Sequence, residues 1–140
     1  MSVRSLVDAR VDRSRLVLGL GIGDLLAVGG FVVAGEIRHG IDPLVAPGYV
    51  GETLALFLLG WATAALLGGL YTRDAVKSPR RVLSWTLPAW IMATLLVHAV
   101  MALVGFHGGT GLTFVAVTLG IGGVLVVGWR LVVSLVLDLE

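Results

Sequence analysis

Long apolar runs that are almost free of charge fill most of this chain. A helix needs about 20 residues to cross the roughly 30 Å hydrocarbon core of a bilayer. Four runs reach that length, and they predict transmembrane helices at about residues 16–35, 53–71, 82–104 and 112–136. A segment in lipid must pair its own backbone polar groups, which leaves helices and closed barrels. Because the runs lack the alternation of barrel strands, we predict an all-α fold, an integral membrane four-helix bundle.

The composition agrees with burial in lipid. Of the 140 residues, 57% are hydrophobic and 14% are charged, whereas soluble domains carry about 25% charged residues. A chain this short has too little interior to hide so much apolar surface. Its length predicts a single transmembrane domain over residues 1–140. The net charge of +1 predicts no nucleic-acid partner, and the absence of cysteine excludes disulfides, iron–sulfur clusters and cysteine nucleophiles.

Basic residues lie on alternate sides of the predicted spans, and Lys and Arg favour cytoplasmic loops. They gather before the first span and between the second and third: Arg4, Arg10, Arg13, Arg15, Arg73, Lys77, Arg80 and Arg81. The loop after the first span holds only Arg38, and the loop after the third span holds no basic residue. This pattern predicts cytoplasmic N and C termini in a multi-pass protein of a prokaryotic cell (plasma) membrane. Residues 1–15 are then a cytoplasmic basic segment, either a short interfacial helix or an unstructured tail.

Small residues form ridges on two of the spans. Gly60, Ala64 and Gly68 follow one another at four-residue intervals on the second span, and Gly19 and Gly23 do so on the first. Such ridges let helices approach closely in lipid. We expect packing within the bundle, and a homo-oligomer through either ridge is the alternative.

Two charged residues lie inside the predicted spans. Asp24 is near the middle of the hydrocarbon, and Arg130 lies about 9 Å from the end of the fourth span, at 1.5 Å per residue. An ionisable group in a membrane is costly, so both mark a candidate polar site. Their depths differ by less than the reach of an arginine, which makes an ion pair between spans one and four plausible. Three interpretations remain open. The two residues form a structural ion pair, or Arg130 extends to the headgroups, or Asp24 carries an ion or a proton.

A second polar group lies toward the external side. Glu36, Arg38, His39 and His107 form a candidate external mouth, and Glu36 and His39 have an i, i+3 spacing. Paired copies of that spacing bind metals in some helix bundles, but this chain has one copy. We therefore expect a solvated mouth and no metal site or resident cofactor.

His98 is the third candidate inside the membrane, within the third span. We expect it to form a hydrogen bond with a neighbouring helix. A proton relay is one alternative, and ligation of haem together with His39 or His107 is another.

Motifs of soluble enzymes are missing. Residues 19–24 do not form the dinucleotide fingerprint, because Asp24 takes the place of its last glycine and no strand precedes it. There is no phosphate-binding loop, serine elbow or zinc-binding HExxH motif. We expect no enzymatic activity.

The pattern of Gly23-Asp24, then Glu36 and Arg38-His39-Gly40, then three further spans resembles an uncharacterised family of four-helix membrane proteins. That family is a domain of unknown function found in haloarchaea and actinobacteria, and the similarity covers roughly residues 16–136. The resemblance implies four transmembrane helices and no established activity. It marks Asp24, Arg38 and His39, with no role assigned to them.

Three functional hypotheses follow from these residues. The first is a small ion, proton or solute transporter or channel-like protein with Asp24 at its polar centre. The second is a structural or accessory subunit of a membrane complex, in which Asp24 and Arg130 form a structural pair. The third is a membrane haem or metal redox protein that uses His98 and His39.

Overall fold

The computed structural model describes residues 2–107 and 111–138. In chain order, its helices are α1 (Val3–Arg10), α2 (Arg15–Arg38), α3 (Pro47–Leu67), the 3₁₀ turn η1 (Arg73–Val76), α4 (Pro79–Val104), α5 (Leu112–Val117), the π-helical turn η2 (Thr118–Gly122) and α6 (Gly123–Asp138). Helices α5, η2 and α6 are continuous, and together with α2, α3 and α4 they give four helices long and apolar enough to cross a membrane. The described residues contain no strand. The predicted all-α fold with four long apolar helices is confirmed.

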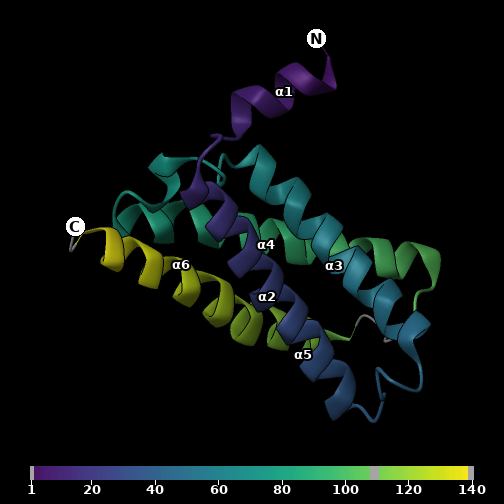
Figure 1. Cartoon of the computed structure of the whole chain (residues 1–140). Helices are drawn as coiled ribbons and strands as arrows, with labels where there is room; N and C mark the ends of the chain where they lie inside the picture. Colours follow the sequence, from purple (N-terminus) through teal and green to yellow (C-terminus); the bar gives the residue numbers. More distant parts are fainter. Residues whose placement is uncertain (1, 108–110, 139–140) are drawn as a thin grey trace.

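The four long helices pack side by side in a ring (Figure 1). Helix α3 packs against α2 and α4, and α6 packs against the same two helices. One end of the bundle is where α2 and α4 begin and where α3 and α6 end. We call it the basic end, because the basic residues of the N-terminal segment and of the α3–α4 loop lie there, and we call the opposite end the far end. Large apolar side chains point outward, among them Leu26, Leu59 and Leu103, as expected for a surface that faces lipid.

The second helix differs from its predicted bounds. It begins at Pro47 rather than at residue 53, since a proline in the first helical turn loses no hydrogen bond. It ends at Leu67 rather than at residue 71. Beyond it, Gly69 adopts a φ of +69°, a left-handed conformation that glycine tolerates best. The chain therefore leaves the helix before Tyr71, which lies in the loop. The predicted glycine-rich loop at 105–111 lies partly outside the described residues.

The N-terminal segment is helical from Val3 to Arg10. The hydroxyl oxygen of Ser2 accepts a hydrogen bond from the backbone N–H of Ser5 at 3.2 Å and so caps the helix, which is the usual role of serine at this position. Of the two alternatives, the helix is therefore correct. Its location at a membrane surface remains a prediction.

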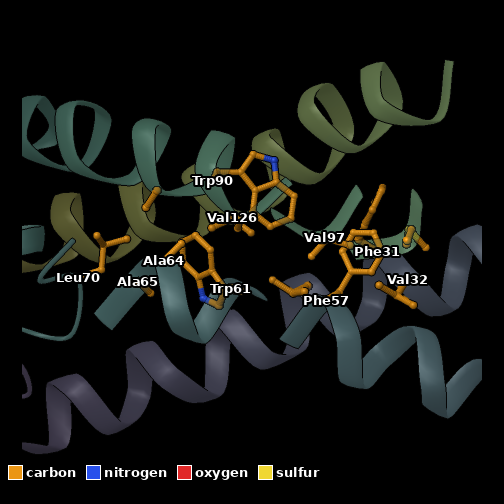
Figure 2. Close-up of a cluster of buried hydrophobic side chains, with 14 residues drawn as sticks. Phe31, Val32, Phe57, Trp61, Ala64, Ala65, Leu70, Trp90, Val97 and Val126 are labelled. Carbon is orange, nitrogen blue, oxygen red and sulfur yellow. The ribbon is translucent and has the colours of Figure 1, made fainter. Parts of the chain in front are cut away.

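Four aromatic residues lie in the core between the four long helices. Trp61 of α3 and Trp90 of α4 lie at its centre with ring centroids 5.7 Å apart, and both are buried. Phe57 packs edge-on against Phe31 of α2 toward the far end. Figure 2 shows the indole nitrogen of Trp61 turned toward α2, away from the apolar cluster.

The glycine ridges pack largely inside the chain. A Cβ atom on Gly60 would lie 2.5 Å from Val97 of α4, so α3 and α4 approach closely there. A Cβ on Gly23 would overlap the indole ring of Trp129 on α6. Gly68 is similarly close to Leu70, whereas Gly19 has open space around it. Homo-oligomer formation remains a prediction, and in this set Gly19 is the glycine with space for a partner.

Candidate functional site

Asp24 and Arg130 form an ion pair inside the bundle. Arg130 donates from Nε to Asp24 Oδ1 at 3.1 Å and from Nη2 to Oδ2 at 2.6 Å. Their side chains are 1% and 0% exposed, respectively. This two-point geometry matches the planar guanidinium to both carboxylate oxygens. Of the alternatives that the sequence leaves open, the structure contains the ion pair, which joins α2 to α6.

Two aromatic side chains complete the shell of the carboxylate. The indole Nε1 of Trp61 donates to Asp24 Oδ2 at 3.2 Å, and the hydroxyl of Tyr71 donates to the same oxygen at 2.9 Å. With the two bonds from Arg130, the carboxylate accepts four hydrogen bonds. A carboxylate has about four acceptor positions. Oδ2 accepts three of these bonds and Oδ1 accepts one. Oδ2 is therefore saturated, and the 1% exposure of the side chain leaves Oδ1 little access to solvent.

Arg130 is also satisfied within the chain. Its Nη1 donates to the backbone carbonyl of Leu70 at 3.0 Å. The guanidinium carbon lies 5.7 Å from the ring centroid of Trp61 and 5.4 Å from that of Tyr71, within the range of cation–π attraction. The same cation thus binds α2 through Asp24 and the turn after α3 through Leu70.

Local sequence positions these groups. Gly23 precedes Asp24 and lets Trp129, the neighbour of Arg130, lie directly on α2. The turn at Gly69 directs the backbone so that Leu70 and Tyr71 face the pair, and the N–H of Leu70 bonds the carbonyl of Ala65 at 2.9 Å. We call Asp24, Arg130, Trp61, Tyr71 and the Leu70 carbonyl the buried lock.

The Tyr71 hydroxyl acts as a hydrogen-bond donor in this cluster. Tyr71 lies in the loop beyond α3. Burial, and then the negative charge of Asp24, raise the pKa of this hydroxyl well above its usual value. Tyr71 therefore keeps its proton through the physiological pH range and remains able to donate to Asp24.

His98 lies apart from the buried lock, in contact with η2. Its Nε2 is 3.3 Å from the hydroxyl oxygen of Thr118, and its ring packs edge-on against Phe114 at 4.9 Å. The Thr118 hydroxyl donates to the Phe114 carbonyl at 2.8 Å, so it accepts from His98. The expected hydrogen bond to a neighbouring helix is thus present. Because Nε2 is occupied in this way, this geometry gives no support to haem ligation through that atom.

The π-helical turn η2 has its own local cause. The indole of Trp90 lies against Gly122, where a Cβ atom would overlap the ring. Its Nε1 donates to the carbonyl of Thr118 at 3.1 Å. Trp90 therefore fills the space at the turn and bonds a carbonyl there. Single π-helical turns inside α-helices are frequent at functional sites.

The residues of the predicted external mouth lie at the far end. Of this set, His107 contacts the side chains of Glu52 and Tyr49. Nε2 of His107 is 3.2 Å from Oε2 of Glu52, and its ring lies 3.5 Å from that of Tyr49. Glu36 is half-buried, and Arg38 and His39 are exposed at the end of α2. Among the described residues, no group of three His, Asp or Glu side chains is placed to hold a metal ion.

Trp61 and Tyr71 are functional-site residues that sequence reasoning missed. By sequence alone, the mid-span position of Trp61 indicates a packing or lipid-facing residue, and the position of Tyr71 near the end of a predicted span indicates a residue at the membrane interface. A signal for Trp61 was available, because a tryptophan in the middle of a span needs an acceptor for its N–H. Sequence offers no comparable signal for Tyr71, because its position depends on where α3 ends.

The comparisons with known proteins assign no activity to the chain. No curated protein and no solved structure matches the chain. A family model described as a protein of unknown function, DUF3054, matches residues 21–133. That match includes both members of the ion pair and most of the four long helices. The chain therefore belongs to the DUF3054 family.

Proposed function

We propose that this chain is a structural or accessory subunit of a membrane complex, and that the buried lock holds its helices in register. The observation that carries the proposal is the burial of Asp24 and Arg130 with their hydrogen bonds made inside the chain. An ion or proton pathway needs a polar group that a solute or water can reach. Here the central carboxylate is surrounded by protein donors.

The energetics of such a pair favour a positioning role. Burying two charges costs several kcal/mol per ion, and only a well-satisfied geometry recovers that cost. The pair therefore adds little net stability, but any other arrangement of α2 and α6 would leave a bare charge in the membrane. This gives one packing of the helices a large advantage over its alternatives, in the way that buried polar groups fix register in coiled coils.

A groove on the lipid-facing side gives a subunit of this kind a place to dock. It has a volume of about 550 Å³ and lies along α5, η2 and the start of α6. Its walls are almost entirely apolar, and they include the small residues Ala116 and Gly120, four positions apart. A Cβ atom on Gly120 would meet nothing within 4 Å. Small residues at this spacing let another membrane helix approach closely, so we propose a transmembrane helix of a partner subunit as the occupant.

Two glycine variants test the docking. Gly120→Leu fills the groove, whereas Gly30→Leu adds the same side chain on α2 at another glycine with open space around it. The proposal predicts that a partner co-purifies from native membranes in mild detergent with the native chain and with Gly30→Leu, and is lost with Gly120→Leu. A native chain that purifies alone, with its lipids retained, would contradict the proposal.

Transport remains the second candidate because of one contact. Tyr71 binds Asp24 through its hydroxyl, and it also lines a surface groove between α2 and residues 11–14. A movement of this side chain would connect the groove with the carboxylate. Flux of protons and of monovalent cations into liposomes separates the two candidates. The subunit proposal predicts flux equal to that of empty liposomes, and flux that Asp24→Asn abolishes in a folded protein would favour transport.

We further propose that the chain resides in the plasma membrane with its basic end toward the cytoplasm. The proposal rests on the alternation of Lys and Arg between the two ends of the bundle.

A further inference from the structure

Helix α1 is joined to the bundle by a few hydrogen bonds but contributes nothing to its core. None of its residues is buried. Its connection to the bundle is made just after it, where the N–H of Asp12 donates to the Tyr71 carbonyl at 2.9 Å and the Asp12 carboxylate accepts from the N–H of Arg73 at 2.8 Å. In Figure 1, α1 extends sideways from the basic end, crosswise to α2. Because no residue of α1 is buried, its surface is available to contact lipid or another molecule.

One contact fixes which side of α1 faces the membrane. Arg10 donates from Nη1 to the carbonyl of Leu67 at 3.0 Å, at the last residue of α3. On a helix, Val3, Leu6 and Val7 share a face with Arg10, because they precede it by seven, four and three residues. The apolar side chains therefore lie on the side that looks back toward the end of α3. Asp8 and Ser5 lie on the other side.

The depth of this face follows from the long helices. Helix α3 ends and α2 begins at the basic end, so these residues mark the boundary between the apolar spans and the basic loops. The exposed fractions of Val3, Leu6 and Val7 are 78%, 48% and 42%. An amphipathic helix at this level places such side chains in the boundary between headgroups and acyl chains.

A groove continues this surface into the apolar region. It has a volume of about 480 Å³ and is lined at its basic end by residues 11–14 and deeper by Leu18, Gly21, Ile22 and Leu25 of α2, with Tyr71 beside them. Asp12 and Arg13 line its polar end, and Arg13 forms an ion pair with Asp8. Arg4 and Arg15 are exposed nearby in sequence, and neither makes an ion pair with another described residue. Residues 4–15 hold four arginines and two aspartates, a net charge of +2. A segment of net positive charge beside an apolar groove matches a molecule with an anionic head and a hydrocarbon tail.

We propose that α1 and this groove bind an anionic phospholipid of the leaflet at the basic end. The phosphate lies beside Arg4 and Arg15, which are unpaired among the described residues, and one acyl chain lies along Leu18, Gly21 and Ile22. The apolar face of α1 covers the neighbouring acyl chains. Charge complementarity and the position of α1 at the end of the spans select this lipid as the occupant, since each basic residue near an anionic surface strengthens binding about fivefold.

The immersion of α1 can be measured directly, because the chain contains no cysteine. Val7→Cys carries a spin label on the apolar face, and Ala9→Cys carries it on the opposite face as a matched control; both positions are exposed. Each labelled protein is placed in nanodiscs of phosphatidylglycerol or of phosphatidylcholine. We expect the label at position 7 to be accessible to oxygen and shielded from a water-soluble nickel chelate in phosphatidylglycerol, and the label at position 9 to show the reverse. Equal exposure of both labels to the nickel chelate would overturn the proposal.

The choice of lipid is tested separately by native mass spectrometry after purification from an equal mixture of the two lipids. We expect retained phosphatidylglycerol to exceed phosphatidylcholine, and Arg4→Gln with Arg15→Gln to reduce that preference roughly 25-fold, about fivefold for each arginine. Arg38→Gln, an exposed arginine at the far end, should leave the preference unchanged. Equal retention of the two lipids by the native chain, or an equal loss with Arg38→Gln, would refute the anionic site.

Discussion

Replacing Asp24 by asparagine tests the buried lock at its centre. The substitution keeps the shape of the side chain and removes its charge, so it leaves Arg130, which is 0% exposed, without a counter-ion. The new amide also places N–H donors in a shell that already consists of donors from Arg130, Trp61 and Tyr71. Removing one partner of a buried pair costs about 3–5 kcal/mol. We expect Asp24→Asn to lower the free energy of unfolding by that amount.

The pairing itself is isolated by a double-mutant cycle. Arg130→Met removes the cation and keeps much of its apolar stem, and the double variant with Asp24→Asn leaves no bare charge. Residues in direct contact show coupling energies of up to about 3 kcal/mol, so the double variant should be more stable than the sum of the single losses predicts, by about 1–3 kcal/mol. The assay is unfolding by dodecyl sulfate in mixed micelles, followed by circular dichroism. A loss below about 1 kcal/mol for Asp24→Asn, together with additive single effects, would refute the buried lock.

Two further substitutions probe the same packing in the same unfolding assay. Trp61→Phe removes one of the donors to Asp24 Oδ2 at 3.2 Å, and we expect a loss of about 1.5–3 kcal/mol, the value for a hydrogen bond to a charged group; an unchanged midpoint would show that this bond contributes nothing. Gly23→Ala places a methyl group into the ring of Trp129, and overpacking of this kind costs about 1–3 kcal/mol. Gly30→Ala, where the added atom meets nothing within 4 Å, should be neutral, and equal effects of the two alanines would contradict the close approach of α2 and α6.

The long helices were predictable because the cost of exposing backbone polar groups to lipid leaves few alternatives. The pairing of Asp24 with Arg130 was predictable for a related reason. An unpaired charge in a membrane is costly, so two opposite charges at similar depth are expected to pair. Both inferences depend only on position along the chain and on the depth that position implies.

The remainder of the site depends on how each helix is rotated about its axis. Helix α2 is apolar on nearly all sides, so its sequence does not reveal which face meets α6 and which faces lipid. Trp61 turns its N–H toward Asp24 only when α3 is rotated to bring Gly60 against Val97. Tyr71 reaches the carboxylate because Gly69 ends the helix early. These choices are settled by side-chain packing between helices that are distant in sequence, which a single sequence does not display.

Membership of DUF3054 gives the chain a family without an activity, so the claim that matters most for function is the state of the central carboxylate. Solid-state nuclear magnetic resonance of labelled protein in a phospholipid bilayer measures it directly. We expect a strong dipolar contact between Asp24 Cγ and Arg130 Cζ, and no transfer of magnetisation from water protons to that carboxylate. A carboxylate that receives magnetisation from water and shows no contact with Arg130 would contradict the structural role proposed for the pair.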